Sequence, residues 1–275
     1  PVVLARVRTH LALSRANRAL QRRNADLELL VAERTAEISE QARCLVSSKQ
    51  ELIAAQAATI TAFCALAEAR DNETGNHVRR TQHYVRILAE TLREHPRFRN
   101  QLDDDVIQQL FKSAPLHDVG KVAIPDAILL KPGKLTPDEW EIMKQHCKFG
   151  RNAILQAEHA LGGGGETTFL HYAAEIAYGH HERWDGGGYP LGIAGDAIPM
   201  SARLMAVADV FDALISRRVY KPPFPHDQAI QMMLVERGRH FDPDVVDALK
   251  KVAGKFAEIA TSFRDEPDDT FENGS

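Results

Sequence analysis

The sequence is poor in cysteine and has no stretch in which polar and apolar residues alternate over the length of a strand. Its three cysteines among 275 residues, Cys44, Cys64 and Cys147, lie far apart and form no Cys-x-x-Cys pair. This spacing argues against a disulfide framework and indicates reduced thiols, as in cytosolic proteins, that serve packing rather than chemistry. Because the period of two that marks strands is missing, we predict an all-α fold.

The chain also lacks an excess of charge of either sign, a signal segment and a long apolar run. Its 34 basic and 38 acidic residues give a net charge of −4, which does not suit a protein that wraps polymeric nucleic acid or coats an anionic membrane. We find no run of about 18 apolar residues, so we predict a cytoplasmic protein without membrane insertion. Because the sequence starts at Pro1 without Met, we expect a longer parent chain.

The N-terminal part carries an apolar pattern at heptad spacing. One seam position holds Leu13, Leu20 and Leu27, and the other holds Val31, Ile38 and Leu45. This period favours a left-handed parallel coiled coil, and therefore a homodimer, over a buried helix. Asn17 and Asn24 share a seam position with Val31, where a buried Asn fixes register and two-strandedness. A single exposed amphipathic helix is the alternative.

Further helices follow from spacing and capping signals. One buried helical face is described by Val78, Thr81, Val85, Leu88 and Leu92. Residues 103–114 begin with three acids, where the helix macrodipole favours negative charge. Thr136 and Glu139 have capping-box spacing, so we expect one helix that continues through His146. Residues 202–215 are predicted to be helical as well.

Histidines and acids occur in pairs whose spacing suits metal ions. Glu73 and His77 are four apart, which places a carboxylate and an imidazole on one helical face within reach of a common ion. His117 and Asp118 are adjacent, and the Asp118 carboxylate is able to bridge two cations. Singly, each histidine has a structural explanation, so the case rests on the whole set.

The second half of the chain adds to this set. His180 and His181 form a doublet, and on a helix neighbouring side chains point about 100° apart, so the two imidazoles suit different roles. His146 belongs to the capped helix, and Asp209 lies in an otherwise apolar helix. An unpaired buried carboxylate is costly, and a metal would supply its partner.

These motifs, together with the stretches DGGGYP and IPMSARLMAVADVFDALISRRVYKP, closely resemble the HD-GYP domain. HD-GYP domains are metal-dependent phosphohydrolases of the HD type that degrade the bacterial second messenger cyclic di-GMP. The resemblance covers about residues 61–252 and implies an all-α helical bundle with a buried multinuclear metal site. Position by position, it implies eight ligands of a trinuclear centre, with Asp118 as the bridging carboxylate: Glu73, His77, His117, Asp118, His146, His180, His181 and Asp209.

The resemblance also implies which residues act on the substrate. Asp118 and Lys121 are the expected catalytic residues, and Lys121 would neutralise developing charge or protonate the leaving 3′ oxygen; the alternative is a surface lysine. Arg218 and Lys221 match residues that hold the second phosphate, with Arg217 as the alternative to Arg218. Asp212 would orient a ligand or contact guanine.

The signature loop of the resemblance contains Gly188, Tyr189 and Pro190, which we expect beside the substrate. An ordinary tight turn is the alternative for this loop, since Gly and Pro dominate turns. The four glycines at 162–165 are either part of a lid or a tolerated surface insertion.

The predicted cofactors are two or three divalent metal ions. Imidazole and carboxylate ligands without thiolate suit iron or manganese, and also nickel or zinc. The resemblance implies hydrolysis of cyclic di-GMP to pGpG, with slower cleavage to GMP. Two alternatives are another HD phosphohydrolase activity and a sensor that binds cyclic di-GMP or a diguanylate cyclase domain without turnover.

The first residues, PVVLARVRTHLAL, resemble the last helix of a response-regulator receiver domain. We therefore predict a receiver remnant at 1–13, a coiled-coil linker helix at 14–60, the phosphodiesterase domain at 61–263 and a disordered acidic tail at 264–275. Phosphorylation of the receiver by a cognate histidine kinase would change the pairing of the coiled coil and so the catalytic sites.

Overall fold

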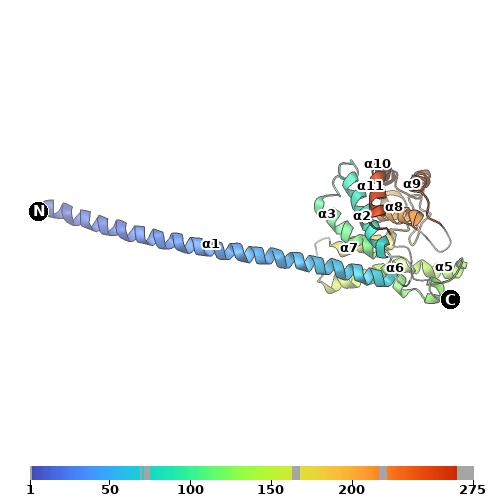
Figure 1. The fold of residues 1–275 in the computed structure, drawn as a ribbon, viewed down its shortest axis with the longest axis horizontal. Helices are drawn as coiled ribbons and strands as arrows, with labels where there is room; N and C mark the ends of the chain where they lie inside the picture. Colours follow the sequence, from blue (N-terminus) through green and yellow to red (C-terminus); the bar gives the residue numbers. More distant parts are fainter. Residues whose placement is uncertain (1, 69, 71–74, 163–167, 217–221, 265–275) are drawn as a thin grey trace, which may run out of the picture. The chain divides into compact units, whose positions relative to one another are not determined.

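The computed structural model describes residues 2–68, 70, 75–162, 168–216 and 222–264. In these ranges the regular structure is helical, and β structure is limited to an isolated bridge between Arg237 and Phe241 (Figure 1). The predicted all-α fold is confirmed.

The α-helices are α1 (Val2–Glu68), α2 (Gly75–Leu92), α3 (Asp104–Ser113), α4 (Asp126–Leu129), α5 (Pro137–Met143), α6 (Gln145–Ala160), α7 (Phe169–Gly179), α8 (Met200–Ile215), α9 (His226–Val235), α10 (Pro243–Lys251) and α11 (Ala253–Ser262). Three short 3₁₀ helices are η1 (Ala114–Leu116), η2 (Val119–Ala123) and η3 (Gly195–Ala197).

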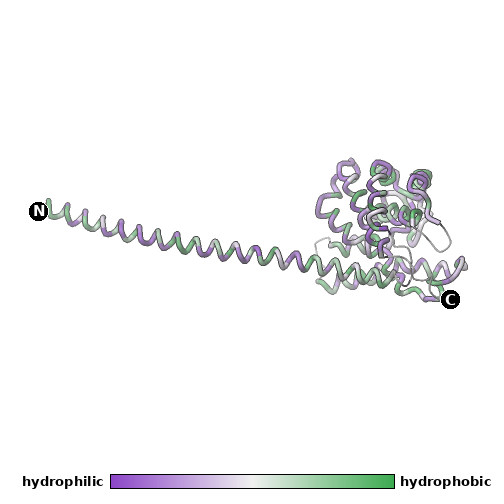
Figure 2. The backbone as a smooth tube through the Cα atoms, in the orientation of Figure 1, coloured by the Kyte–Doolittle hydropathy of each residue, from purple (hydrophilic) through white to green (hydrophobic). Residues whose placement is uncertain are grey.

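The chain divides into two compact units, Pro1–Gln56 and Ala57–Ser275. The described part of the first unit is a helix, and hydrophilic and hydrophobic residues are interspersed along its whole length (Figure 2). Its seam residues are exposed in the single chain, with Leu20 at 61% and Leu27 at 52%. The coiled coil therefore stays a prediction that requires a second chain.

Helix α1 has one property that the sequence prediction did not anticipate. Among the described residues, it alone contains a stretch long and apolar enough to cross a membrane. Length and composition by themselves are weak evidence for a span, and Cys64 near the end of α1 packs in a buried cluster with Val78 and Leu116.

Helix α8 lies at the centre of the second unit, packed against α2, α7, α9 and α10 (Figure 1). It is apolar on most sides, and Leu204, Met205 and Phe211 are fully buried. Burial of one such side chain contributes about 1.5–3 kcal/mol. Since this helix carries Asp209 and Asp212, its burial fixes the backbone from which both carboxylates project.

The predicted face of α2 is buried as expected. Val78, Thr81, Val85, Leu88 and Leu92 each have 2% exposure or less. Val85, Leu88 and Leu92 pack in the core with residues of α8, α10 and α11, whereas Val78 packs in the second cluster with Cys64 and Leu116. The N-terminal turns of α2 carry His77 and Arg80.

The predicted helix starts at α3 and α5 are also present. The Asp103 carboxylate accepts the Val106 N–H at 2.8 Å, and Thr136 and Glu139 form the reciprocal capping box. The prediction of one continuous helix through His146 is wrong, because α5 ends at Met143 and α6 begins at Gln145. The Met143 carbonyl instead accepts Nδ1–H of His146 at 2.8 Å.

Candidate metal centre

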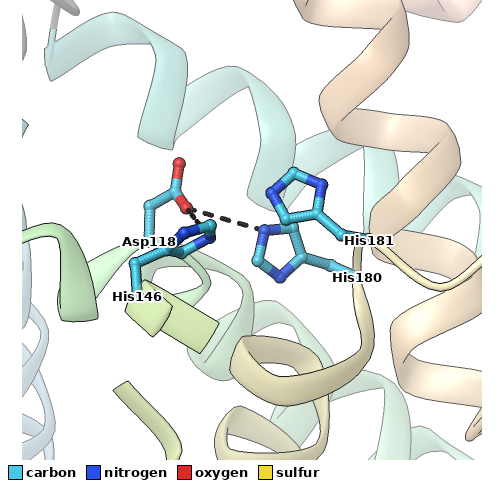
Figure 3. Close-up of side chains that lie close together, drawn as sticks. All are labelled: Asp118, His146, His180 and His181. Carbon is cyan, nitrogen blue, oxygen red and sulfur yellow. Dashed lines mark ion pairs between the residues drawn. The ribbon is translucent and has the colours of Figure 1, made fainter. Parts of the chain in front are cut away.

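The carboxylate of Asp118 faces two histidines from different helices. Asp118 precedes η2, His146 is in the first turn of α6, and His180 caps the end of α7. The Asp118 Oδ1 atom lies 3.3 Å from Nε2 of His146 and 3.5 Å from Nε2 of His180 (Figure 3). With His181, these residues form a group whose donor atoms all lie within 4.8 Å of one another.

A second group of donors consists of His77, His117 and Asp209, also within 4.8 Å of one another. Nε2 of His77 lies 3.4 Å from Nε2 of His117 and 3.8 Å from Oδ1 of Asp209. The other Asp118 oxygen, Oδ2, lies 3.4 Å from Nε2 of His117. Asp118 therefore directs one oxygen to each group.

Three of the histidines are held by the same type of contact. Nδ1 lies 3.0 Å from the Ala114 carbonyl in His117, 2.8 Å from that of Met143 in His146, and 2.9 Å from that of Ile176 in His180. Since a carbonyl accepts, Nδ1 carries the proton. Nε2 is thereby left with a free lone pair in the neutral ring, as metal ligation requires.

His77 is oriented by a carboxylate. Its Nδ1 donates to Oδ2 of Asp212 at 2.9 Å, and Arg80 donates to both oxygens of Asp212 at 2.7 and 2.9 Å. The Asp212 side chain is fully buried, so it offers no surface to a ligand in this structure. In the described structure Asp212 contacts His77 and Arg80, and its role towards a ligand or guanine stays a prediction.

The charge state of the first group suits cation binding. Burial raises the pKa of Asp118, but the Lys121 ammonium group holds that pKa well below its usual range. Burial lowers the pKa of His146 and His181. Asp118 is therefore anionic and these two imidazoles are neutral, which are the protonation states of ligands.

Lys121 lies beside the Asp118 carboxylate. Its Nζ is 2.8 Å from Oδ2 of Asp118, and only 16% of its side chain is exposed. The alternative of a surface lysine does not fit this position.

The loop that follows the histidine doublet packs on the site. Tyr189 stacks on His181 with ring centroids 4.7 Å apart and planes 27° apart. The buried carboxylate of Glu182 accepts the N–H groups of Leu191 at 2.6 Å and Ile193 at 3.2 Å, which fixes the loop. A Cβ on Gly188 would lie 2.3 Å from the backbone nitrogen of Arg183, so only glycine allows this close approach.

The donor set fits divalent metal ions. Asp118 Oδ1 and His180 Nε2 are buried and have no hydrogen-bond partner among the described residues. Buried polar atoms are normally satisfied, so this pair indicates a missing partner that binds both. Neither of the two donor groups contains a thiol, and burial raises the pKa of the nearby Cys147 thiol. The donors are thus imidazole and carboxylate.

Several predicted residues lie outside the described ranges: Glu73, Arg217, Arg218, Lys221 and the last three of the four glycines at 162–165. The other seven predicted ligands come together in the two groups. The sequence analysis missed Arg80 and Glu182. Burial of an Arg or Glu is the signal for both, and it is visible only in the fold.

The HD domain family matches residues 40–245. The chain belongs to the HD domain family. The membership predicted from the motifs is thereby confirmed. A probable cyclic di-GMP phosphodiesterase of Vibrio cholerae is 49% identical over 97% of this chain and 57% of its own length. The cyclic di-GMP phosphodiesterase response regulator RpfG of Xanthomonas campestris is 40% identical over 80% of this chain and 54% of its own length.

The fold of this HD domain also occurs among solved structures. A cyclic GMP-AMP specific phosphodiesterase of V. cholerae, V-cGAP3, aligns with a TM-score of 0.50 and 16% identity over 75% of this chain and 51% of its own. At this identity the likeness shows the fold alone. The chain spans about half the length of the curated relatives it matches.

Proposed function

We propose that the chain is the catalytic part of a metal-dependent phosphodiesterase that hydrolyses cyclic di-GMP to pGpG and, more slowly, to GMP. The observation that carries the proposal is Asp118, whose two oxygens face two separate groups of histidines. Two cations bridged in this way suit the hydrolysis of a phosphodiester. The names of both relatives, which refer to cyclic di-GMP, support the choice of substrate.

The proposed ligands are Glu73, His77, His117, Asp118, His146, His180, His181 and Asp209. Bound divalent metals would supply Lewis acidity to a phosphate oxygen and activate water near neutral pH. The chain's own contribution is to fix His77, His117, His146 and His180 through Nδ1, so that these ligand atoms need little rearrangement on binding. Iron or manganese is the preferred metal, and nickel or zinc would accept the same donors.

Lys121 has two proposed roles in the reaction. Its ammonium group, 2.8 Å from Oδ2 of Asp118, would stabilise the negative charge that increases on the phosphate in the transition state. It would then donate a proton to the leaving 3′ oxygen and recover one from solvent. Arg218 and Lys221 would hold the second phosphate, which lies away from the metals.

The proposed assembly is a homodimer in the cytoplasm, formed by the seam residues of α1. Their exposure in a single chain supports this, because leucines at heptad spacing are normally buried against a partner. An upstream receiver domain, phosphorylated by a cognate histidine kinase, would regulate the enzyme through this helix; one relative is a response regulator by name. A diguanylate cyclase domain is a further proposed partner.

The test is chromatography of the products formed from cyclic di-GMP by protein purified without oxygen and loaded with Mn²⁺ or Fe²⁺. We expect pGpG, abolished by chelator and by His117→Ala with Asp118→Ala. Intact cyclic di-GMP bound by the metal-loaded protein would instead support the sensor. Hydrolysis of other cyclic dinucleotides at an equal rate would contradict the choice of substrate.

A further inference from the structure

The side chain of Trp140 is partly exposed to solvent on α5, a helix whose start is fixed by a capping box. Trp140 is 44% exposed, although tryptophan is highly buried on average. The capping box fixes the start of α5, and Lys131 binds both oxygens of Glu139 at 2.6 and 2.8 Å. The backbone N–H of Trp140 donates to the Thr136 carbonyl at 2.9 Å, within the first turn of α5. The indole ring is therefore available to a ligand at a defined position.

A series of ring contacts connects Trp140 to the metal centre. Trp140 meets Tyr189 with ring centroids 5.9 Å apart and planes at 78°, and Tyr189 stacks on His181. His181 belongs to the Asp118 group. In a nucleotide the base is separated from its phosphate by one ribose, so a phosphate held at this group places a base close to these rings.

A positive charge accompanies the rings. Nζ of Lys144 lies 5.9 Å from the centroid of Tyr189 and is paired with Glu141 at 2.6 Å. An exposed aromatic ring beside a cation is the combination that binds unpaired bases and their phosphates.

We infer that Trp140 forms a stacking platform for a purine base of the bound dinucleotide. This inference rests on the proposed function, since it names the part of the same site that receives the base. Every base has a π face, so Trp140 adds affinity and does not distinguish guanine from adenine. Trp140 contacts the substrate away from the reacting phosphate, so it contributes to substrate binding rather than to the chemical step.

The test compares two substrates in metal-loaded enzyme: cyclic di-GMP and bis(p-nitrophenyl) phosphate, a diester without purines. For Trp140→Ala we expect the KM for cyclic di-GMP to increase roughly tenfold with kcat within about twofold, and bis(p-nitrophenyl) phosphate turnover to stay unchanged. Trp140→Phe should restore most of the affinity. Ile142→Ala is the matched control, because Ile142 is 42% exposed on the same helix but points away from Trp140.

Equal KM values for wild type and Trp140→Ala would overturn the inference, as would an equal loss on both substrates. If wild type hydrolyses neither diester, the proposed function fails. Equilibrium binding of cyclic di-GMP then decides the inference separately: weaker binding by Trp140→Ala than by Ile142→Ala supports the platform, and equal binding removes it.

Discussion

The carboxylate of Asp212 lies 2.9 Å from Nδ1 of His77 and holds that ring in the orientation of a ligand. Both residues are buried, and Arg80 provides the counter-charge for Asp212. His77 is thus oriented by a carboxylate, whereas His117, His146 and His180 are oriented by backbone carbonyls.

Asp212→Asn should weaken the metal bound by the His77 group. An amide is a poorer partner for the imidazole N–H, and loss of such an orienting group typically costs about 10–100-fold in metal affinity. Metal content per chain and the dissociation constant measure the effect. Asp247→Asn is the control, since Asp247 pairs with Arg237 at the surface. Unchanged metal affinity in Asp212→Asn would contradict the orienting role.

Arg80→Ala should destabilise the second unit. It leaves the Asp212 carboxylate buried without its cationic partner and removes a 2.9 Å hydrogen bond to the Phe263 carbonyl. Removal of one partner of a buried ion pair costs about 3–5 kcal/mol. Urea denaturation measures the loss, and a change below about 1 kcal/mol would show that the pair is not needed for stability.

Gly120→Ala should also destabilise the fold, by about 1–3 kcal/mol or more. A Cβ at Gly120 would lie 1.9 Å from the His146 carbonyl oxygen and 2.5 Å from the Gly150 nitrogen, so η2 would have to move away from α6. Asp118 and His146 would separate as a result. Gly254→Ala is the control: it has open space in α11, and alanine there should stabilise the protein by about 0.4–1 kcal/mol.

Acid should destabilise the metal-free protein partly through His240. Burial lowers its pKa to about 4, and Arg183 adds to the effect. Between about pH 6.5 and pH 4 the unfolded state therefore binds a proton that the folded state does not, so stability is fully present above pH 6.5 and falls as the pH decreases. Because His240 is partly exposed, its contribution should lower the free energy of unfolding by about 1 kcal/mol between pH 7 and pH 5.

Urea denaturation of wild type and His240→Gln at pH 7 and pH 5 isolates this contribution. We expect the free energy of unfolding to fall less in His240→Gln than in wild type. The same fall in both proteins would assign the acid sensitivity to other groups.

Leu27→Lys should convert the proposed dimer to a monomer. Leu27 is on the seam, and a charge there would be buried in the coiled coil. Leu29→Lys is the matched control, because Leu29 is 72% exposed and off both seam positions. Light scattering after gel filtration gives the mass. A monomeric wild type, or monomers from both variants, would contradict the proposal that the seam residues form the dimer interface.

The features that could be predicted from the sequence are those determined by residues close together in the chain. The spacing on α2 and the Thr136 capping box determine their helices through neighbouring residues, and both predictions were correct. The histidine and aspartate motifs predicted a metal centre, because their donors suit one chemistry wherever the fold brings them together. The seven predicted ligands that lie in the described ranges do meet in the two groups.

Features that arise between distant segments were missed. Arg80 acts on Asp212, 132 residues away, and nothing in its own neighbourhood marks it. Gly120 matters because the backbone of α6 passes beside it. The break between α5 and α6 was missed because no Gly or Pro marks it: Met143, Lys144 and Gln145 stand there.

The most direct test measures cyclic di-GMP hydrolysis as a function of the metal ions bound per chain, with Mn²⁺ added stepwise to metal-free protein. If Asp118 joins two ion sites, pGpG formation should be absent at one ion per chain and increase with the second. Asp118→Asn should bind metal weakly and remain inactive at any loading. Full turnover at one ion per chain, or in Asp118→Asn, would contradict the bridged centre.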